Sequence, residues 1–129
     1  MSSPITKEAL YERTMQFSVR IIQMIKAMPH GNAESVIARQ LTRSATSIGA
    51  NYREACHGKS HADFIAKLKI CEGEADESLY WLELLVNSGI MSRGKMQQLI
   101  DEANELVAIF TASTKTARSS TYSPEPQAR

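Results

Sequence analysis

The chain has 129 residues, of which 43% are hydrophobic and 22% are charged, and its formal net charge is +1. This length and composition are typical of one soluble domain with a single core. The small net charge excludes the overall basic excess that marks many nucleic-acid-binding domains, and it leaves a local basic patch open. The N-terminal residues lack the apolar stretch of a secretory signal, and every apolar run is too short to span a bilayer. We therefore expect a cytoplasmic protein with no membrane partner.

The first predicted helix runs from about Thr6 to Met28 and ends at Pro29 and Gly31, two residues that interrupt helices. Its apolar face repeats at spacings of four and three residues, which is the pattern of a helix that packs on one side. The residues of this face are Leu10, Thr14, Phe17, Ile21, Met24 and Met28.

The second predicted helix runs from about Ala33 to His57, with Asn32 as its N-cap and Gly58 as its C-cap. Two parallel stripes follow the helical spacing. The apolar stripe holds Ile37, Leu41, Ala45, Ile48, Tyr52 and Ala55, and the polar stripe holds Gln40, Ser44, Ser47, Asn51 and Glu54. Small polar residues favour close packing and hydrogen bonding, either within the subunit or against another chain.

The third predicted helix starts after Ser60 and continues to about Ser88, and the fourth starts after Ser92 and continues to about Thr116. The apolar face of the third is Phe64, Leu68, Cys71, Ala75, Leu82 and Leu85, and that of the fourth is Met96, Leu99, Ala103, Leu106 and Phe110. The last segment, residues 117–129, is rich in Ser, Thr and Pro, and we expect it to be disordered.

Only a few residues connect each pair of predicted helices, and short loops require neighbouring helices to run antiparallel. The sequence therefore predicts an all-α fold, an antiparallel up-down-up-down four-helix bundle formed by residues 1–116. The two cysteines, Cys56 and Cys71, lie inside helical patterns. They predict reduced thiols rather than a disulfide framework.

No sequence pattern indicates a catalytic nucleophile or a phosphate-binding glycine loop, so we expect no enzyme activity and no cofactor. A di-iron bundle needs two Glu-x-x-His motifs, and this chain has one, from Glu54 to His57. Cys56, His57, His61 and Asp63 match no usual zinc spacing. We predict no metal site and keep a small-molecule- or metal-binding bundle as the alternative function.

Glu77 lies one turn before Trp81 on a face that otherwise packs, and a carboxylate there needs a partner such as Arg43 or Asn51. Two interpretations stay open, a structural polar network and a surface that contacts a ligand or partner. Trp81 is an anchor in the core or at an interface, or a base-stacking residue. The full candidate set is Gln40, Arg43, Ser44, Ser47, Asn51, Glu54, Glu77 and Trp81.

Arg39, Arg43 and Arg53 share the second helix with the polar stripe. If they face outward, they form a modest phosphate-binding surface and are the candidate contacts to nucleic acid. The alternative is that they pair with the acidic residues, which are almost equally numerous.

The pattern Gln40-x-x-Arg43-Ser44-x-x-Ser47-Ile48-x-x-Asn51-x-x-Glu54 resembles the four-helix bundle family of the bacterial 23S rRNA intervening-sequence proteins. The accessory protein of diversity-generating retroelements is similar. Two later segments resemble the same family, Phe64-Ile65-x-x-Leu68-x-Ile70-x-x-Gly73-x-Ala75-x-Glu77 and Tyr80-Trp81-Leu82-Glu83-Leu84-Leu85. The resemblance extends from about Leu10 to Phe110.

This resemblance implies a long antiparallel bundle that assembles as a barrel-like homopentamer, without enzyme activity. It also implies a role with nucleic acid or ribonucleoprotein. We therefore expect a non-enzymatic, self-assembling helical scaffold. Its expected partners are further copies of itself, and RNA, DNA or a nucleic-acid enzyme such as a reverse transcriptase.

Overall fold

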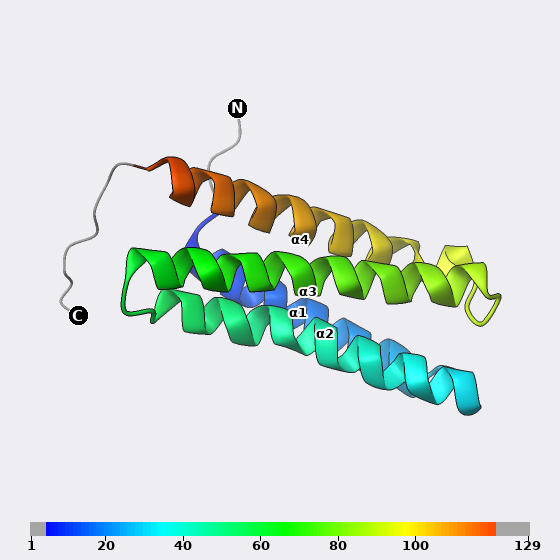
Figure 1. Ribbon diagram of the computed structural model, residues 1–129. Coiled ribbons are helices and arrows are strands. Elements are labelled where there is room, and N and C mark those ends of the chain that lie inside the picture. Colours follow the sequence, from blue (N-terminus) through cyan, green and yellow to red (C-terminus); the bar gives the residue numbers. More distant parts are fainter. Residues whose placement is uncertain (1–4, 121–129) are drawn as a thin grey trace.

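The computed structural model describes residues 5–120, which fold as a bundle of four helices with no β-strand among them (Figure 1). The helices are α1 (Lys7–Lys26), α2 (Asn32–Cys56), α3 (His61–Asn87) and α4 (Arg93–Ser119). Helix α3 lies between α2 and α4 and packs closely on both (Figure 1). Helix α1 packs mainly on α2 and contacts α4 much less. The four predicted helices are confirmed, with boundaries that differ by at most three residues.

Three of the helices begin with a side-chain cap. The hydroxyl oxygens of Thr6, Ser60 and Ser92 accept hydrogen bonds from backbone amides three residues later, at 3.0, 3.0 and 3.4 Å. Helix α2 begins differently. Its N-cap is Gly31, without a side-chain hydrogen bond, and Asn32 is already inside the helix. The prediction of Asn32 as the N-cap was therefore wrong.

The C-terminal ends of α2 and α4 also differ from the prediction. The C-cap of α2 is His57 rather than Gly58. Helix α4 continues three residues beyond the predicted Thr116, to Ser119. The imidazole Nε2 of His61, in the first turn of α3, lies 2.8 Å from the carbonyl oxygen of Ala117. This contact joins the last turn of α4 to α3. Most of the predicted disordered segment, residues 121–129, lies outside the described residues.

The core is formed by the apolar stripes of all four helices. Burying one large aliphatic or aromatic side chain stabilises a fold by about 1.5–3 kcal/mol, so these stripes supply the main driving force for folding. Tyr52 of α2 packs edge-on against Tyr11 of α1 and Phe110 of α4, with ring centroids 5.5 and 5.7 Å apart. The largest fully buried side chains include Phe17, Phe110, Ile21, Leu41, Ile48, Leu68, Leu82, Leu85, Met96 and Leu106.

Contacts between α2 and α3 follow a regular register. Residues 44, 48 and 54 of α2 lie against residues 78, 71 and 67 of α3, so numbers that rise along α2 fall along α3. Helix α1 is joined to α4 by Arg13, whose guanidinium donates to the carboxylates of Glu102, at 2.7 Å, and Glu105. These hydrogen bonds raise the pKa of Arg13.

Both cysteines are free thiols. Cys71 is fully buried in α3, and its Sγ lies 3.5 Å from the carbonyl oxygen of Ile48. Burial raises the pKa of the Cys71 thiol to about 12, which keeps it protonated and unreactive at neutral pH. Among residues 5–120, no helix combines the length and apolar character needed to cross a bilayer.

Candidate functional site

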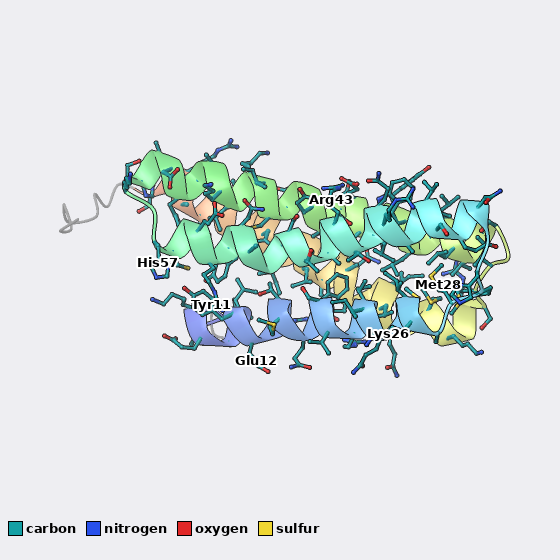
Figure 2. The ribbon with its side chains drawn as sticks, turned by 90° about the horizontal axis from the view of Figure 1, so that it is seen from below. Tyr11, Glu12, Lys26, Met28, Arg43 and His57 are labelled. Carbon is teal, nitrogen blue, oxygen red and sulfur yellow. The ribbon has the colours of Figure 1, made fainter. Side chains whose placement is uncertain are left out.

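Arg43, next to Ser44 of the polar stripe, connects α2 to α3. The Arg43 guanidinium donates to Glu77 and, at 3.2 Å, to Glu74, both on α3. Gln40 lies at the edge of this cluster, with its amide oxygen 3.5 Å from Arg43 Nε. Figure 2 shows Arg43 on the side of α2 that faces away from α1. Arg43 therefore belongs to a network between α2 and α3.

Glu77 has two donors. Besides Arg43, the indole Nε1 of Trp81 donates to Glu77 Oε2 at 3.0 Å. The Arg43 hydrogen bond, and then that of Trp81, hold the pKa of Glu77 below its usual range. The Arg43 and Glu77 side chains are 48% and 35% exposed, so solvent screens the pair and it contributes less than about 1 kcal/mol. Arg43 is thus the partner of Glu77, and Trp81 orients its carboxylate.

Ser44 is the buried member of the stripe. It is fully buried, and its hydroxyl oxygen lies 2.8 Å from that of Ser78 on α3. The Ser78 hydroxyl also donates to the Glu74 carbonyl at 2.9 Å. Small side chains at these two positions let the helices approach closely enough for a hydrogen bond between them. Ser44 is therefore a packing residue within the subunit.

The remaining members of the stripe also bond within the chain. The Ser47 hydroxyl donates to the carbonyl of Arg43 at 2.7 Å, and the Asn51 amide donates to the carbonyl of Ser47 at 2.9 Å. Glu54 accepts from Lys67 of α3 at 2.6 Å. Each of these groups has a partner inside the subunit. These three members of the stripe are therefore hydrogen-bonded within the subunit.

The three candidate arginines do not form one surface. Arg43 bonds to α3, whereas the guanidinium of Arg53 lies 5.5 Å from the centre of the Tyr11 ring on α1, in a cation–π contact. Arg39 is exposed and makes no ion pair with the other residues that the structure describes. Of the three, Arg39 and Arg53 make no ion pair with the residues that the structure describes.

The candidate metal ligands lie apart or bond to the backbone. His57 Nδ1 lies 2.9 Å from the carbonyl oxygen of Arg53, and His61 bonds to α4 as described above. Glu54, the other half of the single Glu-x-x-His motif, pairs with Lys67. Within residues 5–120, no three His, Cys, Asp or Glu side chains are grouped so that they could hold a metal ion.

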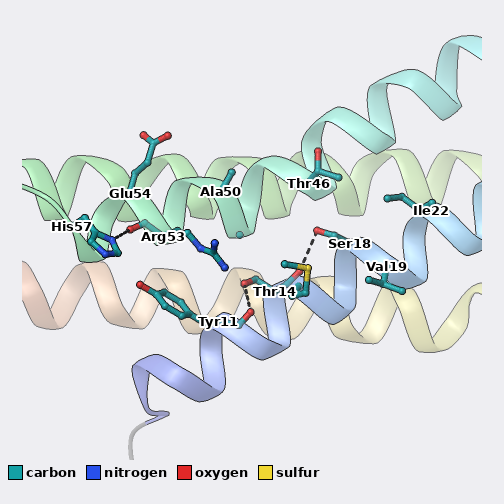
Figure 3. Close-up of a pocket in the computed structure, with 12 residues that line it drawn as sticks. Tyr11, Thr14, Ser18, Val19, Ile22, Thr46, Ala50, Arg53, Glu54 and His57 are labelled. Atoms are coloured by element: carbon teal, nitrogen blue, oxygen red, sulfur yellow. Dashed lines mark hydrogen bonds between the residues drawn. The ribbon is translucent and has the colours of Figure 1, made fainter.

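A groove between α1 and α2 was missed by the sequence analysis. It has a volume of about 730 Å³. Figure 3 shows side chains of both helices pointing into it. Its α1 side includes Met15, Val19 and Ile22, and Met15 and Ile22 are 49% and 39% exposed. The α2 side includes Thr46, Gly49, Ala50, Arg53, Glu54 and His57.

Gly49 of α2, which lines the groove, lies close to Thr14 of α1. A Cβ atom at Gly49 would lie 3.1 Å from Thr14 Oγ1, so glycine lets α1 cross α2 at short distance there. The sequence signal was present in α1, where Met15, Val19 and Ile22 repeat at four- and three-residue spacing beside the core stripe. Ile22 lies next to the buried Ile21 in the sequence and is itself exposed.

Comparisons with known proteins agree with the fold. Residues 6–112 match the family model described as 23S rRNA-intervening sequence protein. A similar solved structure is that of a protein of unknown function from the S23 ribosomal protein family of Bacteroides thetaiotaomicron. The two chains are 36% identical with a TM-score of 0.79, over 85% of this chain and 98% of the other. No curated protein matches the chain. Because the family model spans most of the sequence, the chain belongs to the 23S rRNA-intervening sequence protein family.

Proposed function

We propose that this protein is a non-enzymatic, self-assembling helical scaffold that binds RNA, DNA or a nucleic-acid enzyme. The unit is an antiparallel up-down-up-down bundle, which the opposed register of α2 and α3 supports. The assembly is the homopentamer that the family resemblance implies, and the proposal keeps the expectation of a cytoplasmic protein. The observation that carries self-assembly is the apolar groove between α1 and α2.

A second copy of the chain is the occupant that fits this groove. Single exposed apolar residues are normal, whereas several along one groove mark an interaction surface. On a different helix, α3 exposes Ile70 and Tyr80 by 42% and 58%. We call these two residues the α3 ridge. Aromatic residues such as Tyr80 are enriched at protein interfaces.

A groove and a ridge on separate elements of one chain suit a head-to-tail contact. Such heterologous contacts close into rings when the rotation between subunits allows it, whereas a two-fold dimer would pair one patch with itself. The rim of the groove carries both a cation, Arg53, and an anion, Glu54. Self-assembly in which the ridge of one copy packs into the groove of the next would bury the apolar side chains that both surfaces expose in the single chain.

The experiment compares three charge insertions by light scattering at micromolar protein concentration. Ile22→Glu places a charge in the groove, and Ile70→Glu places a charge on the ridge. The two side chains are similarly exposed in the wild type. Val36→Glu is the matched control, because Val36 is 47% exposed and lies in neither surface. We expect the first two variants to dissociate and the control to assemble as the wild type does. Melting by circular dichroism checks that all three are folded.

Mixing the two damaged variants tests the head-to-tail geometry. Each retains one intact surface, so a mixture should form a one-to-one dimer that neither variant forms alone. A monomeric wild-type protein would refute self-assembly. An Ile22→Glu variant that assembles normally would refute the groove as the interface.

The nucleic-acid part of the proposal rests on the family membership and on the exposed cations. Fluorescence anisotropy with structured RNA and with duplex DNA tests it at low and near-physiological salt. Affinity that falls steeply with salt is expected for phosphate contacts. Absence of binding at low salt would refute nucleic-acid binding and would leave a protein as the partner.

A further inference from the structure

A second cleft lies between α3 and α4, and most of its charged lining residues are basic. It has a volume of about 390 Å³ and lies on elements that do not form the α1–α2 groove. Lys69 lies on the α3 side, and Lys115 and Arg118 lie on the α4 side, one turn apart. Glu72 is the single carboxylate in the lining. Three cations therefore face one anion in a chain whose formal net charge is only +1.

These three cations have no ion-pair partner among residues 5–120. In contrast, Arg13, Arg43 and Lys67 all pair with carboxylates of neighbouring helices. All three side chains are exposed. Their positive charge is therefore available to a ligand.

Helix electrostatics explains only part of this cluster. Lys115 and Arg118 lie in the last two turns of α4, where cations favour the negative end of the helix dipole. Lys69 lies on another helix, in the third turn of α3. The helix dipole does not stabilise a cation at that position. Because Lys69 lines the same cleft as Lys115 and Arg118, the three positive charges repel one another. A bound anion would remove that repulsion.

The other groups of the cleft indicate the kind of anion. The hydroxyl of Thr114 is already used, because it donates to the Phe110 carbonyl at 2.8 Å. The hydroxyl of Thr111 has no such partner in the described structure and can donate to a ligand. An arginine fork, two lysine ammonium groups and a hydroxyl donor are suited to the several oxygens of a phosphate.

Glu72 further limits the chemical class of anion that the cleft can bind. Its negatively charged carboxylate repels a simple inorganic anion. The same carboxylate can accept hydrogen bonds from hydroxyl or amino groups of an organic anion. A phosphate ester that carries such donors would bind the three cations through its phosphate and Glu72 through its hydroxyl or amino groups. A volume of about 390 Å³ is within the range of pockets that hold small organic ligands.

We propose that the α3–α4 cleft binds the phosphate of a nucleotide through Lys69, Thr111, Lys115 and Arg118. The phosphate belongs either to an RNA or DNA chain or to a free mononucleotide. The first case rests on the proposed nucleic-acid binding and locates its main contact on α3 and α4, away from Arg39 and Arg53. The second case is independent of it.

The test compares two double variants on the same helix. Lys115→Gln/Arg118→Gln removes one lysine and one arginine from the cleft. Lys95→Gln/Arg93→Gln removes the same pair of charges from the first turn of α4, outside the cleft. Anisotropy of labelled single-stranded RNA and duplex DNA is measured between about 50 and 200 mM salt. Circular dichroism checks that both variants are folded.

We expect the cleft variant to bind about tenfold more weakly at low salt, and its log–log salt slope on duplex DNA to fall by about two. The control should keep the wild-type slope. An equal loss in both variants would show general charge attraction and would overturn the proposal. So would a loss confined to an Arg39→Gln/Arg53→Gln variant.

Titration of wild-type protein with adenosine monophosphate separates the two sources of phosphate. Amide NMR shifts at residues 69, 111, 115 and 118 are the readout. If no nucleic acid binds, shifts that vanish in the cleft variant would keep the cleft as a mononucleotide site while the nucleic-acid function fails. If neither nucleic acid nor mononucleotide binds, both proposals are refuted.

Discussion

Ser44 of the polar stripe is hydrogen-bonded to Ser78 of α3, and a double-mutant cycle measures the contribution of this bond to stability. Both residues are fully buried, and their hydroxyl oxygens are 2.8 Å apart. A buried neutral hydrogen bond contributes about 1 kcal/mol net, and each Ser→Ala change inside a helix returns about 0.5 kcal/mol of helix propensity. Each single variant should therefore lose about 0.5 kcal/mol of unfolding free energy.

The double variant loses the same single hydrogen bond but gains helix propensity at both positions. Its unfolding free energy should stay within a few tenths of a kcal/mol of the wild type, on the order of 0 net change. The coupling energy of the cycle is then about 1 kcal/mol, and the weaker bonds of each serine to its own helix cancel in it.

Urea unfolding, followed by circular dichroism at a single protein concentration, supplies the four free energies, since self-assembly would otherwise contribute to stability. Ser47→Ala is the matched control. Its hydroxyl bonds only to its own helix, at Arg43, so it should be additive with Ser78→Ala. A coupling energy near zero for Ser44 and Ser78, or one equal to that of the control, would refute the packing role of Ser44.

Two further predictions concern Glu77 and the thiols. Because the pKa of Glu77 is lowered by Arg43 and Trp81, its stabilisation is present at neutral pH and lost as the pH falls below the ordinary carboxyl range through that lowered pKa. The fluorescence of Trp81 should change over that acid range in the wild type and not in Glu77→Gln, and identical titrations would contradict the contact. Native protein should react with a thiol reagent at Cys56 alone, because Cys71 is buried with a pKa of about 12. Cys56→Ser should then react only after unfolding, and fast labelling of that variant would show that Cys71 is accessible.

The extent of the helices could be read from the sequence to within three residues, because apolar spacing and caps are local signals. The third and fourth helices were predicted to start after Ser60 and Ser92, and in the structure these two serines cap them. Asn32 was assigned by the same reasoning and failed, because the chain reversal after Pro29 places Gly31 at the cap position. The last turn of α4 was not predicted, and it contacts His61, a residue 56 positions away in the sequence that local signals do not include.

The candidate sites depended more on tertiary structure. The sequence put Arg39, Arg43 and Arg53 on one helix, but it could not show that Arg43 bonds to α3 while Arg53 lies over Tyr11. It likewise gave no reason to group Lys69 with Lys115 and Arg118, since only the packing of α3 on α4 brings them to one cleft.

Hydrophobic periodicity alone determined that this chain forms four long helices and which face of each is buried, because burial of a regular apolar stripe needs no knowledge of its partner. Only the tertiary structure decided which polar residues form hydrogen bonds or ion pairs inside the subunit and which stay exposed. That outcome depends on the lateral placement of whole helices, and a shift of one helix by a single turn would give Arg43, Ser44 and Lys69 different neighbours.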